Sequence, residues 1–174
     1  ERFFLYLPHT MPHIPLFVSP NFEGKSDASL YGDVVETIDD GIGRILQTLA
    51  ENNIDDNTLV IFTSDNGPWY EGSSGRYRDR KGASWEGGQR VPFFARWPGV
   101  IPAGLTSAAI SMNIDLLPTL AKLAQAKLPE GRTIDGKDVS QVWFAGAPSP
   151  HEALFLFNED QVAAIRTPKW KFVV

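Results

Sequence analysis

Two oxygen-bearing side chains lie where an apolar run ends: Asp65 and Asn66 follow residues 58–64. In an open α/β sheet, ligands bind beyond the carboxyl ends of the strands, so we expect these side chains at a ligand-binding edge. Carboxylate and amide oxygens are the ligands that calcium and magnesium prefer, and calcium takes about six to eight of them. The pair therefore predicts part of a metal site whose remaining ligands come from elsewhere.

A simpler interpretation treats Asp65-Asn66-Gly67 as a strand-end turn, because Asn-Gly is a favoured turn pair. Two observations count against it. A hairpin would return a strand at once, whereas a long glycine- and charge-rich loop follows over residues 67–90. A carboxylate at the end of so apolar a strand also needs a partner to offset its desolvation, and a divalent ion would provide one.

Lys81 opens a second polar segment, which runs through Trp85-Glu86-Gly87-Gly88 to Arg90. The glycines allow close backbone approach and tight reversal, so the loop can return to the edge that carries Asp65. A lone loop lysine is usually solvated, but a buried ammonium here would suit a tetrahedral anion. We expect Glu86 and Arg90 to hold the loop by ion pairing and Trp85 to anchor it by packing.

The remaining titratable residues divide into one candidate and several side chains with simpler roles. His13 lies on a proline-stiffened loop and can donate to an anion or act as a general acid. His9 on the same loop can be structural, and His151 lies in an expected surface loop with no partner that we can name. Asp39 and Asp40 are expected on the exposed face of a helix.

Strands and helices alternate along the chain. Apolar runs at 3–7, 59–63 and 91–97 predict strands, and the order strand, helix, strand implies a right-handed crossover with parallel pairing. Ser26 or Asp27 can cap the long helix between the first two. Its apolar stripe consists of Leu30, Val34, Ile38, Ile42, Ile45 and Leu49.

A second helix and a change of character follow. Asn113 or Asp115 can cap a helix that runs to about Ala126. Its expected buried stripe consists of Leu116, Leu117, Leu120, Leu123 and Ala124. Beyond residue 129, short runs at 154–157, 162–166 and 170–174 predict an antiparallel meander that starts a smaller second domain. The sequence thus predicts an α/β protein with a small β-rich addition.

Composition excludes several classes of protein. The net charge of −5 and the pI near 5.2 argue against a nucleic-acid partner, which needs a concentrated basic surface. No apolar run reaches the ~20 residues of a membrane span. The absence of cysteine excludes disulfides and thiolate zinc sites. Because the first residue is Glu1 and an apolar run starts at once, we expect the chain to be a piece of something longer.

Five segments together carry a resemblance to a known family, although each is weak alone. They are Pro12-His13-Ile14-Pro15, residues 31–39, residues 59–67, residues 81–92 and Asp115-Leu116-Leu117-Pro118-Thr119-Leu120. In this order the chain resembles the carboxyl-terminal half of the sulfatase family, within the alkaline-phosphatase-like superfamily. The resemblance implies part of a mixed or parallel sheet flanked by helices. Residues 1–129 would be the later half of the catalytic α/β domain, and 130–174 the start of the smaller C-terminal α+β subdomain.

The resemblance also implies an activity, the hydrolysis of sulfate esters in a small molecule or carbohydrate. By that similarity, Asp65 and Asn66 would bind Ca2+ (or Mg2+), and Lys81 and His13 would contact the sulfate as catalytic residues. In the family, a cysteine or serine in a Cys/Ser-x-Pro-x-Arg motif becomes formylglycine, whose hydrate attacks sulfur, and two further aspartates complete the metal site. This sequence contains neither feature. We therefore expect them upstream and expect the isolated chain to be inactive.

Two alternatives stay open. A phosphodiesterase or phosphonate monoester hydrolase of the same superfamily would suit the same anion pocket, because phosphate and sulfate are both tetrahedral. A non-catalytic fragment could instead bind sulfated glycans. The resemblance is compatible with a periplasmic, secreted or lysosomal location, and no signal peptide is visible within these 174 residues. Exposed strand edges would make the truncated chain self-associate.

Overall fold

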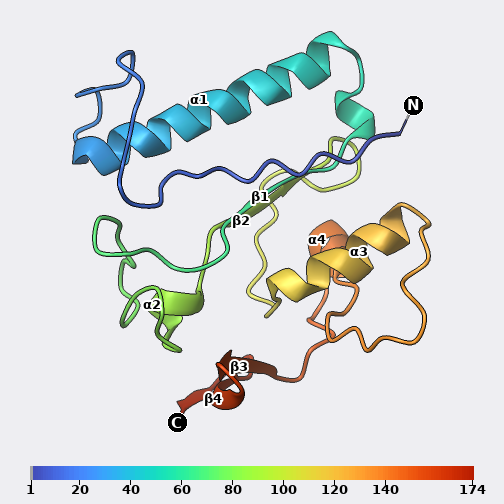
Figure 1. The fold of residues 1–174 in the computed structure, drawn as a ribbon. Helices are drawn as coiled ribbons and strands as arrows, with labels where there is room; N and C mark the ends of the chain where they lie inside the picture. Colours follow the sequence, from blue (N-terminus) through green and yellow to red (C-terminus); the bar gives the residue numbers. More distant parts are fainter. Residues whose placement is uncertain (1) are drawn as a thin grey trace. The chain divides into compact units, whose positions relative to one another are not determined.

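The computed structural model describes residues 2–174 (Figure 1). The chain divides into two compact units. The first unit ends at Asp55, and the second comprises Asp56–Val174. Two short 3₁₀ turns, η1 (Asp55–Asn57) and η2 (Asn113–Asp115), accompany the helices and strands. No helix in the described part of the chain is long and apolar enough to span a membrane.

The first unit is built around α1 (Ser29–Glu51), a helix of 23 residues. Val34 and Leu49 from the predicted apolar stripe are buried, and Asp39 and Asp40 are exposed as expected. The predicted cap is wrong, because the helix begins after Ala28 and no side chain caps it. The Ser26 hydroxyl instead accepts a hydrogen bond from the Ala28 amide at 3.1 Å, within the turn that leads into the helix.

The predicted strand at 3–7 is not formed. Residues 3–7 are extended but lie outside both sheets of the described chain, and their side chains are exposed. A strand exists only when a neighbour accepts and donates its backbone hydrogen bonds, and both sheets are built from other segments. The expected parallel pairing of 3–7 with 59–63 therefore has no counterpart among the described residues.

The strands predicted at 59–63 and 91–97 are confirmed as β1 (Val60–Thr63) and β2 (Phe93–Arg96). They pair antiparallel, with Thr63 opposite Phe93, and lie side by side in Figure 1. Because of this direction, the chain leaves β1 at the same end where it enters β2. The residues that follow Thr63 and the residues that precede Phe93 therefore lie at the same end of the sheet, although a long loop separates them in sequence.

Two helices cover the core of the second unit. α3 (Leu116–Leu123) is shorter than predicted, and it buries Pro118 and Thr119 while Leu117 is exposed. Leu116 and Leu123 of the predicted stripe do face the core, and beside them the Thr119 hydroxyl accepts a hydrogen bond from the Val139 amide at 3.0 Å. The helix α4 (Ser140–Ala145) is not predicted by the sequence pattern, because its six residues are too few for a clear helical period. The core consists of Val139, Val142 and Trp143, with Leu59, Ile61, Leu116 and Leu123 packed against it.

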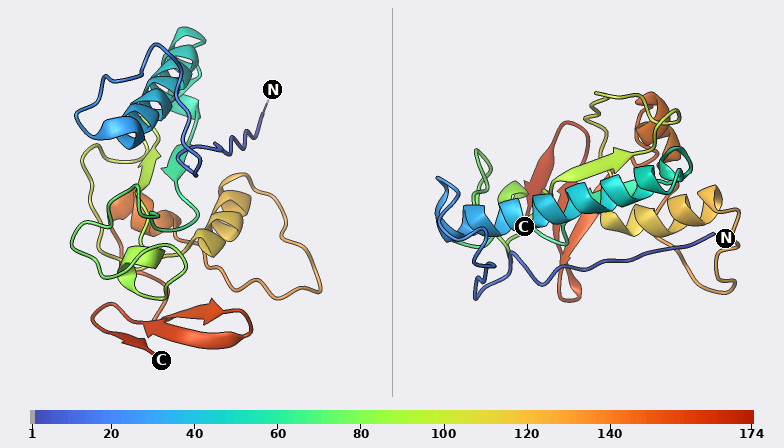
Figure 2. Two further views of the ribbon diagram at one scale, coloured as in Figure 1. Left: turned by 60° about the vertical axis from the view of Figure 1, so that its left-hand side comes forward. Right: turned by 90° about the horizontal axis from the view of Figure 1, so that it is seen from above.

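The predicted C-terminal meander is confirmed. The strands β3 (Leu154–Asn158), β4 (Gln161–Arg166) and β5 (Lys171–Val173) form an antiparallel sheet in that order (Figure 2). Strand alternation places side chains on opposite faces. Leu154, Leu156 and Ala164 are buried, whereas Phe155, Phe157 and Phe172 are exposed.

Candidate active site

Asp65 and Asn66 lie just after β1, in a turn that is held by side-chain hydrogen bonds. The Asn66 side-chain amide donates to Asp65 Oδ2 at 2.5 Å, so the two predicted ligands lie against each other. The Ser64 hydroxyl donates to the Asn66 carbonyl at 3.2 Å, and the Asn113 side chain donates to the Ser64 carbonyl at 2.9 Å. Asp65 itself is exposed, so its carboxylate is open to a ligand.

Gly67 joins this turn to the loop before β2. Its amide donates to the Gly88 carbonyl at 2.9 Å, and a methyl group at Gly67 would lie 2.0 Å from the Gly87 carbonyl oxygen. Only glycine allows so close an approach. The Asp-Asn-Gly segment is therefore not a hairpin turn, because β1 pairs with β2 on the far side of the loop.

Lys81 lies beside the same segment. Its backbone amide donates to the Pro68 carbonyl at 3.0 Å, one residue beyond Gly67. The side chain is half-buried, and within residues 2–174 its ammonium forms no ion pair. The second unit therefore brings Asp65, Asn66 and Lys81 onto one backbone framework.

The loop around Lys81 is braced by aromatic and ionic contacts. The predicted ion pair of Glu86 with Arg90 is present at 3.6 Å, from the first residue of α2 (Glu86–Gln89). Trp85 is an anchor as expected, with the Arg78 guanidinium 3.9 Å from its ring centroid. Arg80 donates to the carbonyls of Trp69 and Gly72 at 3.0 and 2.7 Å, so its charge holds the loop together.

His13 belongs to the first unit, on the loop before α1. Its Nδ1 lies 2.7 Å from the Ile14 carbonyl oxygen, which can only accept a hydrogen bond. Nδ1 therefore carries the proton in the neutral ring, and Nε2 is left as the proton-accepting atom. The side chain is exposed, as is that of His9.

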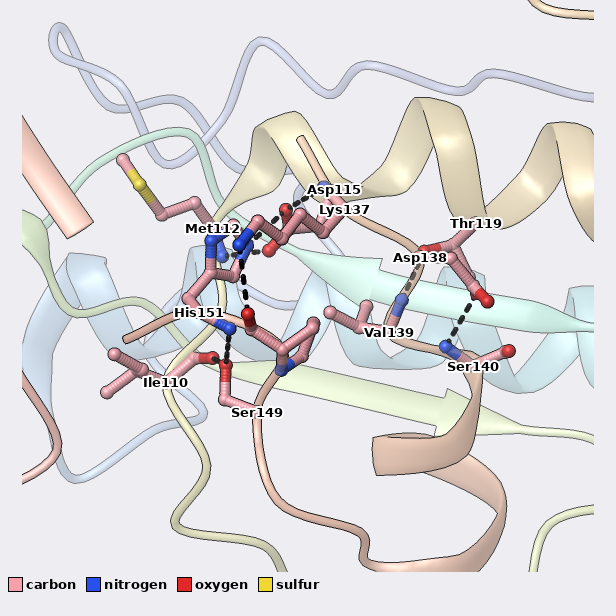
Figure 3. Close-up of polar contacts among 11 residues, drawn as sticks. Ile110, Met112, Asp115, Thr119, Lys137, Asp138, Val139, Ser140, Ser149 and His151 are labelled. Carbon is pink, nitrogen blue, oxygen red and sulfur yellow. Dashed lines mark hydrogen bonds and ion pairs between the residues drawn. The ribbon is translucent and has the colours of Figure 1, made fainter. Parts of the chain in front are cut away.

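The expectation that His151 lies in a surface loop without a partner is wrong. His151 is 7% exposed and Asp115 is 1% exposed, and His151 Nε2 lies 2.8 Å from Asp115 Oδ1 (Figure 3). The same carboxylate accepts the amides of Met112 and Lys137, each at 2.8 Å. The carboxylate of Asp115 thus accepts hydrogen bonds from all three groups. Through them it links the start of α3 to the later segments that contain Lys137 and His151. The sequence pattern predicts Asp115 as a helix cap, but no local pattern predicts that His151, 36 residues later, is its partner.

A pocket beside this pair contains no predicted site residue. A cavity of about 360 Å³ is lined mostly by small side chains of residues 106–110 and 146–149, with His151 at its wall. The His151 ring is already engaged by Asp115. The cavity therefore adds no free titratable group to the candidate site.

The two side chains after β1, Asp65 and Asn66, are the right type of ligand for a hard divalent ion, but two side chains are too few to complete its coordination. One carboxylate and one carboxamide supply oxygen ligands of the type that Ca2+ prefers. In the described part of the chain, no cluster of three or more histidine, aspartate or glutamate side chains could hold a metal. Such an ion would need further ligands from outside these residues.

Comparison with known proteins decides the family. The protein-family model described as Sulfatase matches residues 1–126. The chain belongs to the sulfatase family. Sulfatase relatives include an arylsulfatase of Hemicentrotus pulcherrimus, 37% identical over 98% of this chain and 32% of the relative, and human steryl-sulfatase, 42% identical over 94% of this chain and 30% of the relative. The chain thus spans about a third of their length.

Solved structures confirm the predicted α/β fold class. A sulfatase from Pseudoalteromonas sp. superimposes with a TM-score of 0.87 at 30% identity, over 92% of this chain and 34% of that one. A second structure, solved in complex with its substrate D-glucosamine-2-N,6-O-disulfate, gives a TM-score of 0.64 at 30% identity, over 83% of this chain and 31% of that one. The sulfatase fold therefore accounts for the order of helices and strands described above.

Proposed function

We propose that this chain is part of a sulfuric ester hydrolase, in which Asp65 and Asn66 bind Ca2+ (with Mg2+ as the alternative) and Lys81 and His13 contact the sulfate ester. The observation that carries the proposal is the pair of backbone hydrogen bonds that joins the segment after β1, which contains Asp65 and Asn66, to the segment that contains Lys81. The Gly67–Gly88 and Lys81–Pro68 hydrogen bonds, at 2.9 and 3.0 Å, support a fixed relation between the metal-ligand pair and the cation. A fixed cation suits an oxyanion, because it stabilises charge without reorganising.

Lys81 would act on the charge that develops at the sulfuryl oxygens. Its half-buried ammonium has no carboxylate partner in the described chain, so its charge is available to an anion. A bound divalent ion would supply Lewis-acid polarisation of the same oxygens. An ammonium is a compact point charge, which suits the tetrahedral symmetry of a sulfate group.

His13 would handle the proton of the leaving group. The hydrogen bond from Nδ1 to the Ile14 carbonyl fixes the ring, so in the doubly protonated imidazolium Nε2 carries the proton that would be transferred. Protonating a leaving alkoxide by a positioned general acid contributes a rate factor of about 10²–10⁴.

The nucleophile would come from outside residues 1–174. We propose a formylglycine there, together with the missing half of the metal shell, so the isolated chain is expected to be inactive. The chain spans about a third of its relatives, which supports a longer enzyme. The isolated piece is also expected to self-associate, because residues 3–7 carry five exposed apolar or aromatic side chains.

We propose a sulfated small molecule or carbohydrate as the substrate. A similar structure was solved with a disulfated glucosamine as its substrate, and two relatives are named steryl-sulfatase and arylsulfatase. In this chain, Trp69 and Tyr70 form an exposed edge-to-face pair with ring centroids 4.9 Å apart. Exposed aromatic faces on the loop between Gly67 and Lys81 can pack against a sugar or an aryl ring.

The decisive experiment expresses the full reading frame that encodes this chain together with a formylglycine-generating enzyme. We expect hydrolysis of para-nitrophenyl sulfate, and we expect Lys81→Met to lower kcat/KM by about 10²–10³ because it removes a preorganised charge. Lys169→Met, which removes an exposed lysine outside the loop, is the matched control. Para-nitrophenyl phosphate is the competing substrate. Hydrolysis of the phosphate alone would point to the phosphoryl-transfer alternative, and hydrolysis of neither would reject the proposal.

A further inference from the structure

Glu86, five residues after Lys81, is also held by the C-terminal sheet. Glu86 Oε1 lies 3.0 Å from Lys171 Nζ on β5 and 3.6 Å from Arg166 Nε on β4. These contacts are additional to its pair with Arg90, which uses the other carboxylate oxygen. One carboxylate on the loop therefore receives cations from strands that lie about half the chain away in sequence.

The burial of this cluster makes the carboxylate necessary. The side chains are 9% exposed for Lys171, 22% for Arg166 and 24% for Glu86. A nearly buried ammonium is costly unless it is paired, and within residues 2–174 Glu86 is the only carboxylate that pairs with Lys171. Arg166 Nη1 is buried without an acceptor in the described chain, so the cluster has more donors than acceptors. If the Glu86 carboxylate moved away, the charges of Lys171 and Arg166 would be left partly buried without a carboxylate partner.

The backbone next to Glu86 transmits its position to the candidate site. The Gly87 amide donates to the Arg78 carbonyl at 2.8 Å, three residues before Lys81. A methyl group at Gly87 would lie 2.0 Å from the Asp79 carbonyl oxygen, so the two backbones touch. The next carbonyl, that of Gly88, accepts the Gly67 amide. A shift of Glu86 must therefore move both the Lys81 segment and the turn that carries Asn66.

We propose that Lys171 and Arg166 are positioning residues for the anion site, acting through Glu86 on the loop that carries Lys81. The proposal rests on the proposed function for the role of Lys81. It makes β4 and β5 a part of the active-site framework, so that the C-terminal sheet sets where the cation stands relative to the metal-ligand pair. None of the three residues needs to touch the substrate.

Native-state hydrogen exchange of the full-reading-frame protein tests the proposal without substrate. We expect Lys171→Met to speed exchange of the Gly67, Lys81 and Gly87 amides by about tenfold, because their hydrogen bonds depend on Glu86. The Ala124 amide, bonded to Leu120 at the end of α3, is the internal control and is expected to stay unchanged. Lys169→Met is the matched variant, because Lys169 lies just before β5 and forms no ion pair within residues 2–174.

Kinetics on an aryl sulfate then separate positioning from general stabilisation. We expect Lys171→Met to lower kcat/KM by about tenfold, Lys171→Arg to restore most of it, and Glu86→Gln combined with Lys171→Met to be no worse than the poorer single variant. If Lys171→Met fails to fold, Arg166→Lys supplies the same comparison, because it weakens only the contact between residue 166 and Glu86.

Three results would overturn the proposal. They are unchanged loop exchange in a folded Lys171→Met protein, equal acceleration at Ala124, and full activity without the Lys171 ammonium. A wild-type protein that hydrolyses no sulfate ester would reject the proposed function instead. In that case the exchange data alone would still decide whether β5 positions the Lys81 loop.

Discussion

The Gly67 amide donates to the Gly88 carbonyl at 2.9 Å, and this bond ties the turn after β1 to the loop before β2. Each partner is flanked by a residue of interest, Asn66 on one side and Glu86 two residues away on the other. The antiparallel pairing of β1 with β2 brings the two segments to the same end of the strands. The relation between the metal-ligand pair and Lys81 therefore depends on this bond together with the hydrogen bond from the Lys81 amide to the Pro68 carbonyl.

Gly67→Ala is expected to destabilise the folded protein by about 1–3 kcal/mol, because the added methyl group overlaps the Gly87 carbonyl oxygen. Gly43→Ala is the matched control, since Gly43 lies in α1 and a methyl group there meets nothing within 4 Å. That variant should gain about 0.5–1 kcal/mol of helix stability. Urea unfolding of the full-reading-frame protein measures both. Equal stabilities of Gly67→Ala and wild type would contradict the close contact.

Calcium binding should depend on the Asp65 carboxylate. Saturating Ca2+ at about a hundred times Kd would stabilise the protein by about 2.7 kcal/mol, and a chelator should reverse the shift in Tm. Asp65→Asn removes the negative charge from the ligand pair, so we expect at least a tenfold weaker affinity, roughly 1.4 kcal/mol.

Asp79→Asn is the control for calcium binding, because Asp79 is an exposed acid in the adjoining loop. Its carboxylate accepts the Arg80 amide at 3.0 Å, a bond that an asparagine oxygen can keep. A calcium-induced Tm shift that survives Asp65→Asn, or that Asp79→Asn abolishes equally, would remove Asp65 from the metal site.

Asp115→Ala is expected to lower the free energy of unfolding by about 3–5 kcal/mol, because it strands three donors in a buried position. Asp135→Ala changes an exposed aspartate nearby and should cost less than about 0.5 kcal/mol. The measurement is urea denaturation at neutral pH. A small loss for Asp115→Ala would mean that His151 and the two amides find other acceptors.

Acid should weaken the anchoring of α1 through Asp33. Hydrogen bonds from the Ser26 and Gly24 amides, at 2.7 and 2.8 Å, lower the pKa of Asp33 from its usual 3.8. A lowered folded-state pKa means that this stabilisation is fully present above pH 3.8 and is lost as pH falls through the lower folded value. Asp33→Asn should therefore remove part of the acid-induced loss of stability, measured as Tm against pH. Asp39→Asn is the control. If Tm falls at low pH as steeply in Asp33→Asn as in wild type, Asp33 does not contribute to the acid-induced loss of stability.

Local pattern alone predicted much of this chain. The apolar period fixed α1, the short runs before turn residues fixed β1, β2 and the β3–β5 meander, and the motif order indicated the sulfatase family, which the comparisons confirm. These features are determined by neighbours in sequence, whose spacing sets which face of an element is apolar. The roles of Asp65, Asn66, Lys81 and His13 stay predictions, since they concern ligands rather than elements.

Tertiary structure alone decided the contacts between distant residues. Residues 3–7 have strand composition, but they pair with no strand among residues 2–174, because a strand also needs a neighbour that local sequence does not specify. His151 finds Asp115, and Lys171 finds Glu86, across separations of 36 and 85 residues. No periodicity encodes such pairs, because which charge meets which depends on the path of the whole chain. A buried charge shows only that some partner must exist, and the fold supplies its identity.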